Sequence, residues 1–182
     1  MSDASEPGWT IRPERPEDAP LIAALNETAF GPGRFAKSAY RLREGVDHAA
    51  ALAFVAIEDG ALKGSVRFWP VSIGGHAALM LGPLAVRLGE RGRGIGVALM
   101  ERAIEEAKAR GHAVVILVGD EPYYARVGFS KLPPGRVRFP GPIDPARILG
   151  LSLKSGAALN LSGEVRRAGL DDPHCADGAG VG

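Results

Sequence analysis

One segment, residues 84–100, constrains the fold of this chain more than any other. It begins with apolar residues typical of a strand, continues through a turn dense in glycine and arginine, and ends in a helical pattern. Within that pattern Leu99, Ala103 and Ala107 recur at the spacing of one helix face. We therefore predict a strand, a loop and a helix that follow one another directly, with the helix ending before Gly111.

The loop breaks an electrostatic rule. Arg91 and Arg93 stand where the helix dipole and unpaired backbone N–H groups already make the potential positive. Gly92, Gly94 and Gly96 allow a ligand to approach the backbone closely, and a bound anion would offset the positive charge. We expect a phosphate or pyrophosphate site here; the alternative is a solvated arginine cluster on a glycine turn.

The spacing of the loop does not fit the two common nucleotide-binding loops. A P-loop requires GxxxxGK[ST], which the chain lacks. A dinucleotide fingerprint GxGxxG would place its third glycine at Val97 or Leu99. Val114 and Val115 occupy the region where that fingerprint needs an acidic residue. Both nucleotide interpretations are therefore weakened.

Two motifs point to a known family. The segment RGRGIG, residues 91–96, resembles the R/Q-x-x-G-x-G/A signature of the GNAT superfamily of N-acetyltransferases, and it follows an apolar strand as that signature does. Downstream, residues 124–129 (YARVGF) resemble the Y-x-x-x-G-F segment of many members. Leu88 departs from the proline that many members carry, and we expect it to change only the stiffness of the turn.

The resemblance implies a fold and a domain. The implied fold is α/β with a mixed (α+β) sheet: a GNAT-like acyltransferase fold whose central, mostly antiparallel sheet contains a splayed parallel strand pair and is flanked by helices. The resemblance spans residues 9–154, which we predict to be the N-acetyltransferase domain. Residues 155–182 are expected to form a C-terminal extension, disordered from about residue 169 onward.

The resemblance also implies acetyl-CoA as co-substrate and no metal. Its pantetheine arm is expected to add to the splayed strand like a short strand, and its pyrophosphate to lie on the loop. The cofactor-binding residues expected on this basis are Leu84, Ala85, Val86, Arg91, Gly92, Arg93, Gly94, Ile95 and Gly96.

Catalysis requires a proton for the leaving thiolate. The family's tyrosine acid corresponds to Tyr124, four residues before Gly128, and Tyr123 is the fallback. A phenol with a pKa of about 10 is a hydrogen-bond donor at pH 7 and suits this role, although composition alone favours core packing for both tyrosines. A general base is left unassigned, because helix capping explains Asp120 equally well.

Local patterns predict the remaining elements. Asp59-Gly60 is a strong hairpin signal, and the two strands around the central helix are expected to be parallel because that helix makes a crossover connection. Strands are predicted at residues 9–12, 51–57, 62–70, 77–86, 113–118 and 148–153, the last ending the sheet, and helices at 18–30, at 35–44 and around the two tyrosines.

Composition excludes several function classes. A net charge of +1 over 182 residues gives no overall reason to expect binding to nucleic acid or to an anionic membrane. The single Cys175 excludes an intramolecular disulfide, and no run approaches the roughly 18 apolar residues of a membrane helix. His48, His76, His112 and His174 show no metal-ligand spacing. We expect a cytoplasmic protein.

These observations lead to two functional hypotheses. The first is an N-acetyltransferase that moves an acetyl group from acetyl-CoA to a primary amine of a small molecule or a protein by direct attack on the thioester. The second is a catalytically idle acyl-CoA-binding sensor or interaction module. The resemblance implies acceptor segments at about residues 29–36 and 133–145, which carry Arg34, Arg136, Arg138 and Asp144. These arginines would suit an acceptor carboxylate, or are ordinary surface arginines. A homodimer is left open.

Overall fold

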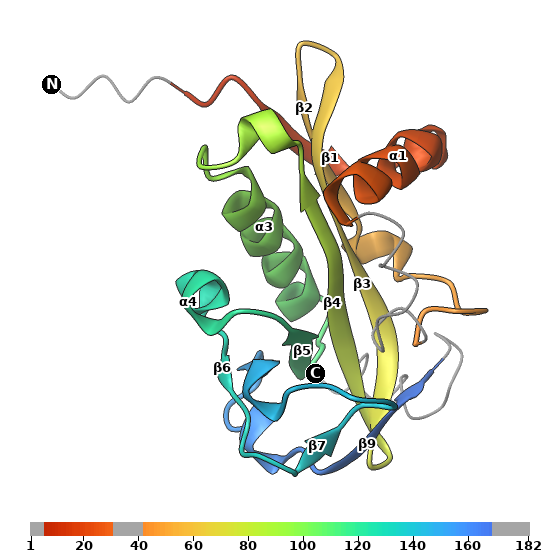
Figure 1. Ribbon diagram of the computed structural model, residues 1–182, viewed down its shortest axis with the longest axis vertical. Helices are drawn as coiled ribbons and strands as arrows, with labels where there is room; N and C mark the ends of the chain where they lie inside the picture. Colours follow the sequence, from red (N-terminus) through yellow and green to blue (C-terminus); the bar gives the residue numbers. More distant parts are fainter. Residues whose placement is uncertain (1–5, 31–41, 169–182) are drawn as a thin grey trace, which may run out of the picture.

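The computed structural model describes residues 6–30 and 42–168, in which nine strands form one mixed sheet (Figure 1). The strands are β1 (Thr10–Pro13), β2 (Phe54–Glu58), β3 (Ala61–Ile73), β4 (His76–Val86), β5 (Val114–Val118), β6 (Ser130–Lys131), β7 (Val137–Arg138), β8 (Ile148–Ser152) and β9 (Gly163–Arg167). They follow the order β1-β2-β3-β4-β5-β8-β6, and β9 pairs with β3 and β7. Within the described residues only β4–β5 and β7–β9 are parallel, so the predicted mixed, mostly antiparallel sheet is confirmed.

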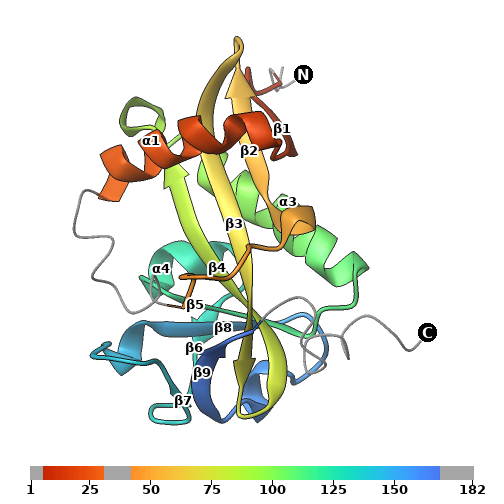
Figure 2. The same cartoon turned by 90° about the vertical axis from the view of Figure 1, so that its right-hand side faces the viewer.

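Helices cover both faces of this sheet. The α-helices in the described residues are α1 (Ala19–Phe30), α3 (Ile95–Ala109) and α4 (Glu121–Tyr124). Figures 1 and 2 show α1 and α3 on opposite faces. The face of α3 that carries Leu99 and Ala103 is fully buried against the sheet, as its spacing predicts. On the other face, Ile22 and Leu25 of α1 pack against the sheet.

The hairpin between β2 and β3 forms where the sequence predicts it. Asp59 and Gly60 have φ angles of +51° and +75°, values that glycine and aspartate tolerate better than other residues. Beyond the turn, β3 continues through residues 71–73 and pairs with β4 over almost its whole length. These two long strands form the centre of the sheet.

Strand β4 parts from β5 after a short contact. The two strands pair only at Leu79–Val115 and Met80–Ile116, and β4 then runs on to Val86. On the other edge of β4, the register with β3 shifts between Val66 and Phe68, as at a β-bulge. The predicted parallel, splayed pair is therefore present.

A buried hydrogen bond holds the bulge. The indole Nε1 of Trp69 donates to the carbonyl oxygen of Gly82 at 2.6 Å, and the Trp69 side chain is only 9% exposed. Next to it, Arg67 and Glu14 form a bidentate ion pair of 2.6 and 3.0 Å. On the sheet face away from α3, Arg67 and Trp69 of β3 therefore each have a polar partner.

Some predicted elements differ from the structure. The strand at 148–153 is not the last one, because β9 follows it and pairs with β3 and β7. The strand predicted from residue 51 begins only at Phe54, since Ala50–Leu52 form a 3-10 turn. The helix predicted at 35–44 and the disorder predicted from 169 lie mostly or wholly outside the described residues, and the domain boundary at 154 stays a prediction.

No helix in residues 6–30 and 42–168 combines the length and apolar character needed to cross a membrane.

We predict that Trp69→Phe destabilises the fold, because the buried Gly82 carbonyl loses its indole donor. The expected cost is about 1–3 kcal/mol more than that of Trp9→Phe, a matched control whose indole has no hydrogen bond within the described residues. Urea unfolding of both variants measures the difference, and equal losses would contradict the role given to this bond.

Candidate active site

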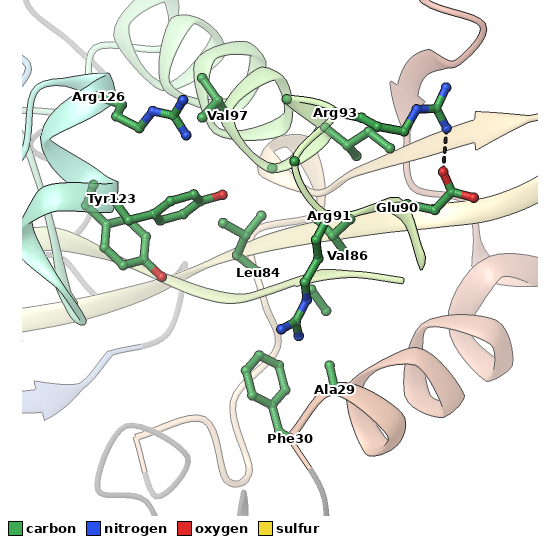
Figure 3. Close-up of a pocket in the computed structure, with 16 residues that line it drawn as sticks. Ala29, Phe30, Leu84, Val86, Glu90, Arg91, Arg93, Val97, Tyr123 and Arg126 are labelled. Atoms are coloured by element: carbon green, nitrogen blue, oxygen red, sulfur yellow. Dashed lines mark hydrogen bonds and ion pairs between the residues drawn. The ribbon is translucent and has the colours of Figure 1, made fainter. Parts of the chain in front are cut away.

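A cavity of about 580 Å³ lies where β4 parts from β5 (Figure 3). Every residue predicted to bind the cofactor lines it, from Leu84 to Gly96, and so does Tyr124. The lining also contains Ala29 and Phe30, which begin the expected acceptor segment 29–36. Glu90, Val97 and Arg126 line the cavity too, and the sequence analysis had assigned them no role. Tyr123, the fallback acid, is part of the lining as well.

One wall of the cavity is the free edge of β4. Leu84, Ala85 and Val86 pair with β3 on one side, whereas the β4–β5 pairing has already ended at Met80. The backbone groups of β4 that point toward β5 beyond Met80 are therefore not used by that strand. An extended, amide-containing ligand would satisfy them by adding to the edge as a strand does.

The loop that follows β4 leads into the positive end of α3. Gly92 and Gly94 have φ angles of +87° and +84°, in the left-handed region that glycine adopts without strain. Gly94 is the N-cap residue of α3 and supplies no side-chain capping bond. The first N–H groups of the helix therefore lack a helical acceptor and suit an anion.

The two loop arginines have different surroundings. Arg93 is held by Glu58, with both nitrogen–oxygen distances 2.8 Å, and it also contacts Glu90. Arg91 has no hydrogen bond or ion pair within the described residues, and Figure 3 shows its side chain pointing toward Phe30. The positive charge expected to require an anion is thus already offset at Arg93 and remains uncompensated at Arg91.

Two tyrosines line the cavity beside the start of α3. Helix α4 places Tyr123 and Tyr124 edge to face, with ring centroids 5.1 Å apart, and Tyr124 also packs edge to face on buried Phe129. The Tyr123 hydroxyl lies so close to Gly96 that a Cβ there would be 2.3 Å from it. Burial is the main cause that raises the pKa of both phenols above 10, so both stay protonated at neutral pH.

The acidic residues beside α4 do not reach the cavity. Asp120 stands at the N-cap of α4, but its carboxylate makes no capping bond and instead lies 3.5 Å from Arg147. The capping explanation offered from the sequence is therefore wrong for its side chain. Glu121 pairs with Lys131 at 3.3 Å. Within the described residues no group of His, Cys, Asp or Glu is arranged to hold a metal ion.

This geometry agrees with the comparison to protein families. The model of the acetyltransferase (GNAT) family matches residues 19–129, which include the loop and both tyrosines. The chain belongs to this family. The resemblance inferred from the two sequence motifs is thereby confirmed for this GNAT chain.

Relatives of known structure extend the match. An uncharacterized N-acetyltransferase of Escherichia coli K12, YhbS, is 37% identical over 123 residues, or 66% of this GNAT chain and 72% of YhbS. The crystal structure of Escherichia coli YhbS in complex with CoA aligns with a TM-score of 0.72 and 31% identity, covering 90% of this chain and 93% of that one. A Brucella melitensis GNAT family acetyltransferase in complex with acetyl-CoA aligns with a TM-score of 0.65 and 30% identity, covering 88% and 96%.

We predict that Gly94→Ala destabilises the chain by about 1 kcal/mol, because a Cβ is strained at a positive φ angle. Gly89→Ala is the matched control: it adds the same atom to open space in the same loop, at a residue without a left-handed φ. Urea unfolding compares the two variants. Equal stabilities would show that the left-handed turn at Gly94 is not required.

Proposed function

We propose that this chain is an N-acetyltransferase that transfers the acetyl group of acetyl-CoA to a primary amine of a small molecule or a protein. The observation that carries the proposal is a cavity that joins a free strand edge, a glycine loop at a helix N-terminus and a partly buried tyrosine. The relatives crystallised with CoA and acetyl-CoA support the choice of donor.

The cofactor would lie along residues that the cavity already brings together. Its pantetheine amides would add to the backbone of Leu84, Ala85 and Val86, which meet no partner from β5. Its pyrophosphate would accept hydrogen bonds from the loop amides up to Gly96, with Arg91 as the neighbouring cation. The thioester would then reach the space in front of Tyr124.

The transfer is a direct displacement in which the amine nitrogen attacks the thioester carbon, a C–N bond forms and the C–S bond breaks. Tyr124 is protonated at neutral pH, because burial raises the pKa of its phenol. It gives this proton to the leaving thiolate as the C–S bond breaks. The surplus proton of the amine goes to a base that we leave unassigned. Alignment of the two reactants in the cavity supplies much of the rate.

Binding of acetyl-CoA tests the first half of the proposal. Isothermal titration calorimetry should detect acetyl-CoA but neither NADH nor ATP, and Arg91→Ala should weaken binding about tenfold through loss of a charge-assisted bond. Arg110→Ala, which removes the same charge at the exposed far end of α3, is the control and should bind normally. No binding by the unsubstituted chain would overturn the proposal.

Turnover tests the second half. A panel of primary amines is first screened for an acceptor by following release of the CoA thiol. With that acceptor, Tyr124→Phe should lower kcat by about 100-fold or more and leave the affinity for acetyl-CoA unchanged. Tyr123→Phe, one residue away and in the same cavity, separates the two hydroxyls. A loss only in Tyr123→Phe would move the acid to Tyr123, and acetyl-CoA binding with no turnover on any amine would favour the idle acyl-CoA-binding module.

A further inference from the structure

Four charged side chains connect the glycine loop to the β2–β3 hairpin. We call them the loop clamp: Glu58 at the end of β2, Lys63 in β3, Glu90 just before the loop and Arg93 within it. Arg93 binds both carboxylate oxygens of Glu58 at 2.8 Å and contacts Glu90. Lys63 completes the clamp with a bond of 2.9 Å from Nζ to Glu90 Oε1.

The clamp engages both terminal nitrogens of Arg93. A guanidinium presents a planar fork that matches one carboxylate in a bidentate pair, and here that fork is used on Glu58. A phosphate that bound the terminal nitrogens of Arg93 would compete with two carboxylates and approach their negative charge. In Figure 3 the Arg93 side chain points to Glu90 and away from Arg91, so the two arginines do not converge on one ligand.

The clamp also holds the part of the loop whose backbone has the widest choice of conformations. Gly92 and Gly94 flank Arg93, and glycine has the widest choice of backbone conformation, which a ligand would otherwise have to restrict at an entropic cost. The hairpin supports the start of the loop too, because the Arg87 N–H donates to the Lys63 carbonyl at 2.9 Å. The loop is thus fixed from the sheet at both Arg87 and Arg93.

We infer that Arg93 is a positioning residue: it binds no phosphate, and through Glu58 and Glu90 it holds the loop amides in place for the pyrophosphate of CoA. This inference rests on the proposed function and revises the sequence-based expectation for one side chain. Arg91 provides the cation that faces the ligand, and the backbone of residues 92–96 provides the amides.

A charge exchange tests the inference. Arg93→Glu places a third carboxylate beside Glu58 and Glu90, pushes the loop away from the hairpin, and should weaken CoA binding by about tenfold or more. The double variant Arg93→Glu with Glu58→Arg restores a cation between two carboxylates. It should bind CoA within about threefold of the unsubstituted chain, as measured by calorimetry.

A second pair in the same loop is the control. Arg91→Glu, alone and with Glu58→Arg, changes the same charges two residues away without a matching partner. If Arg91 faces the phosphate, Glu58→Arg does not rescue this variant. The two double variants carry the same charges at nearly the same places, so their long-range electrostatic fields are nearly equal. If CoA affinity is restored only in the Arg93 double variant, the direct contact between positions 58 and 93 is therefore responsible.

The outcomes separate the inference from the proposed function. No CoA binding by the unsubstituted chain overturns both. If that chain binds, the inference alone is overturned by an unaffected Arg93→Glu, by a failed rescue, or by equal rescue of both pairs. If Arg93→Glu fails to fold, the milder variants Arg93→Gln and Glu58→Gln replace it. Because each removes the same ion pair, the double variant should bind CoA as weakly as either single variant. If the losses of affinity in the two single variants add up in the double variant, the inference is overturned.

Discussion

The site depends on the parting of β4 from β5. Two residue pairs hold these parallel strands together, and β4 then continues to Val86 beside β3 alone. A buried strand edge is costly unless its amides and carbonyls find partners. The fold therefore contains, in its own sheet, an edge suited to an extended amide ligand, and the cavity lies against it.

If the loop after β4 binds the pyrophosphate, as we propose, it must meet two opposing demands. A phosphate needs close access to backbone amides, which glycine allows, yet a glycine-rich loop is also free to leave the geometry that binds. In this chain the two demands fall on different groups. Gly92 and Gly94 provide access, while Glu58, Glu90 and Arg93 tie the loop to the hairpin.

Local signals in the sequence were sufficient for the elements around the site. The Asp59-Gly60 turn, the amphipathic face of α3 and the apolar run of β5 each carry their own pattern. Strand β9 carries almost none, because only Val165 of its five residues is buried. The pairing of Arg93 with Glu58 joins residues 35 positions apart, so no local pattern predicts it, and the sequence rule on helix dipoles assigned both loop arginines to an anion.

The two faces of the sheet near the site are held by different interactions. On the α3 face the loop is fixed by partly exposed ion pairs that solvent and salt weaken. On the other face Glu14 is almost fully buried beside Arg67, and His48 stands 3.7 Å from Glu14. Burial, followed by the charge of Arg67, lowers the pKa of His48, so this imidazole is neutral at pH 7 and does not compete for Glu14. Buried polar contacts thus support the bulge, while weaker and partly exposed ion pairs support the loop proposed to bind the ligand.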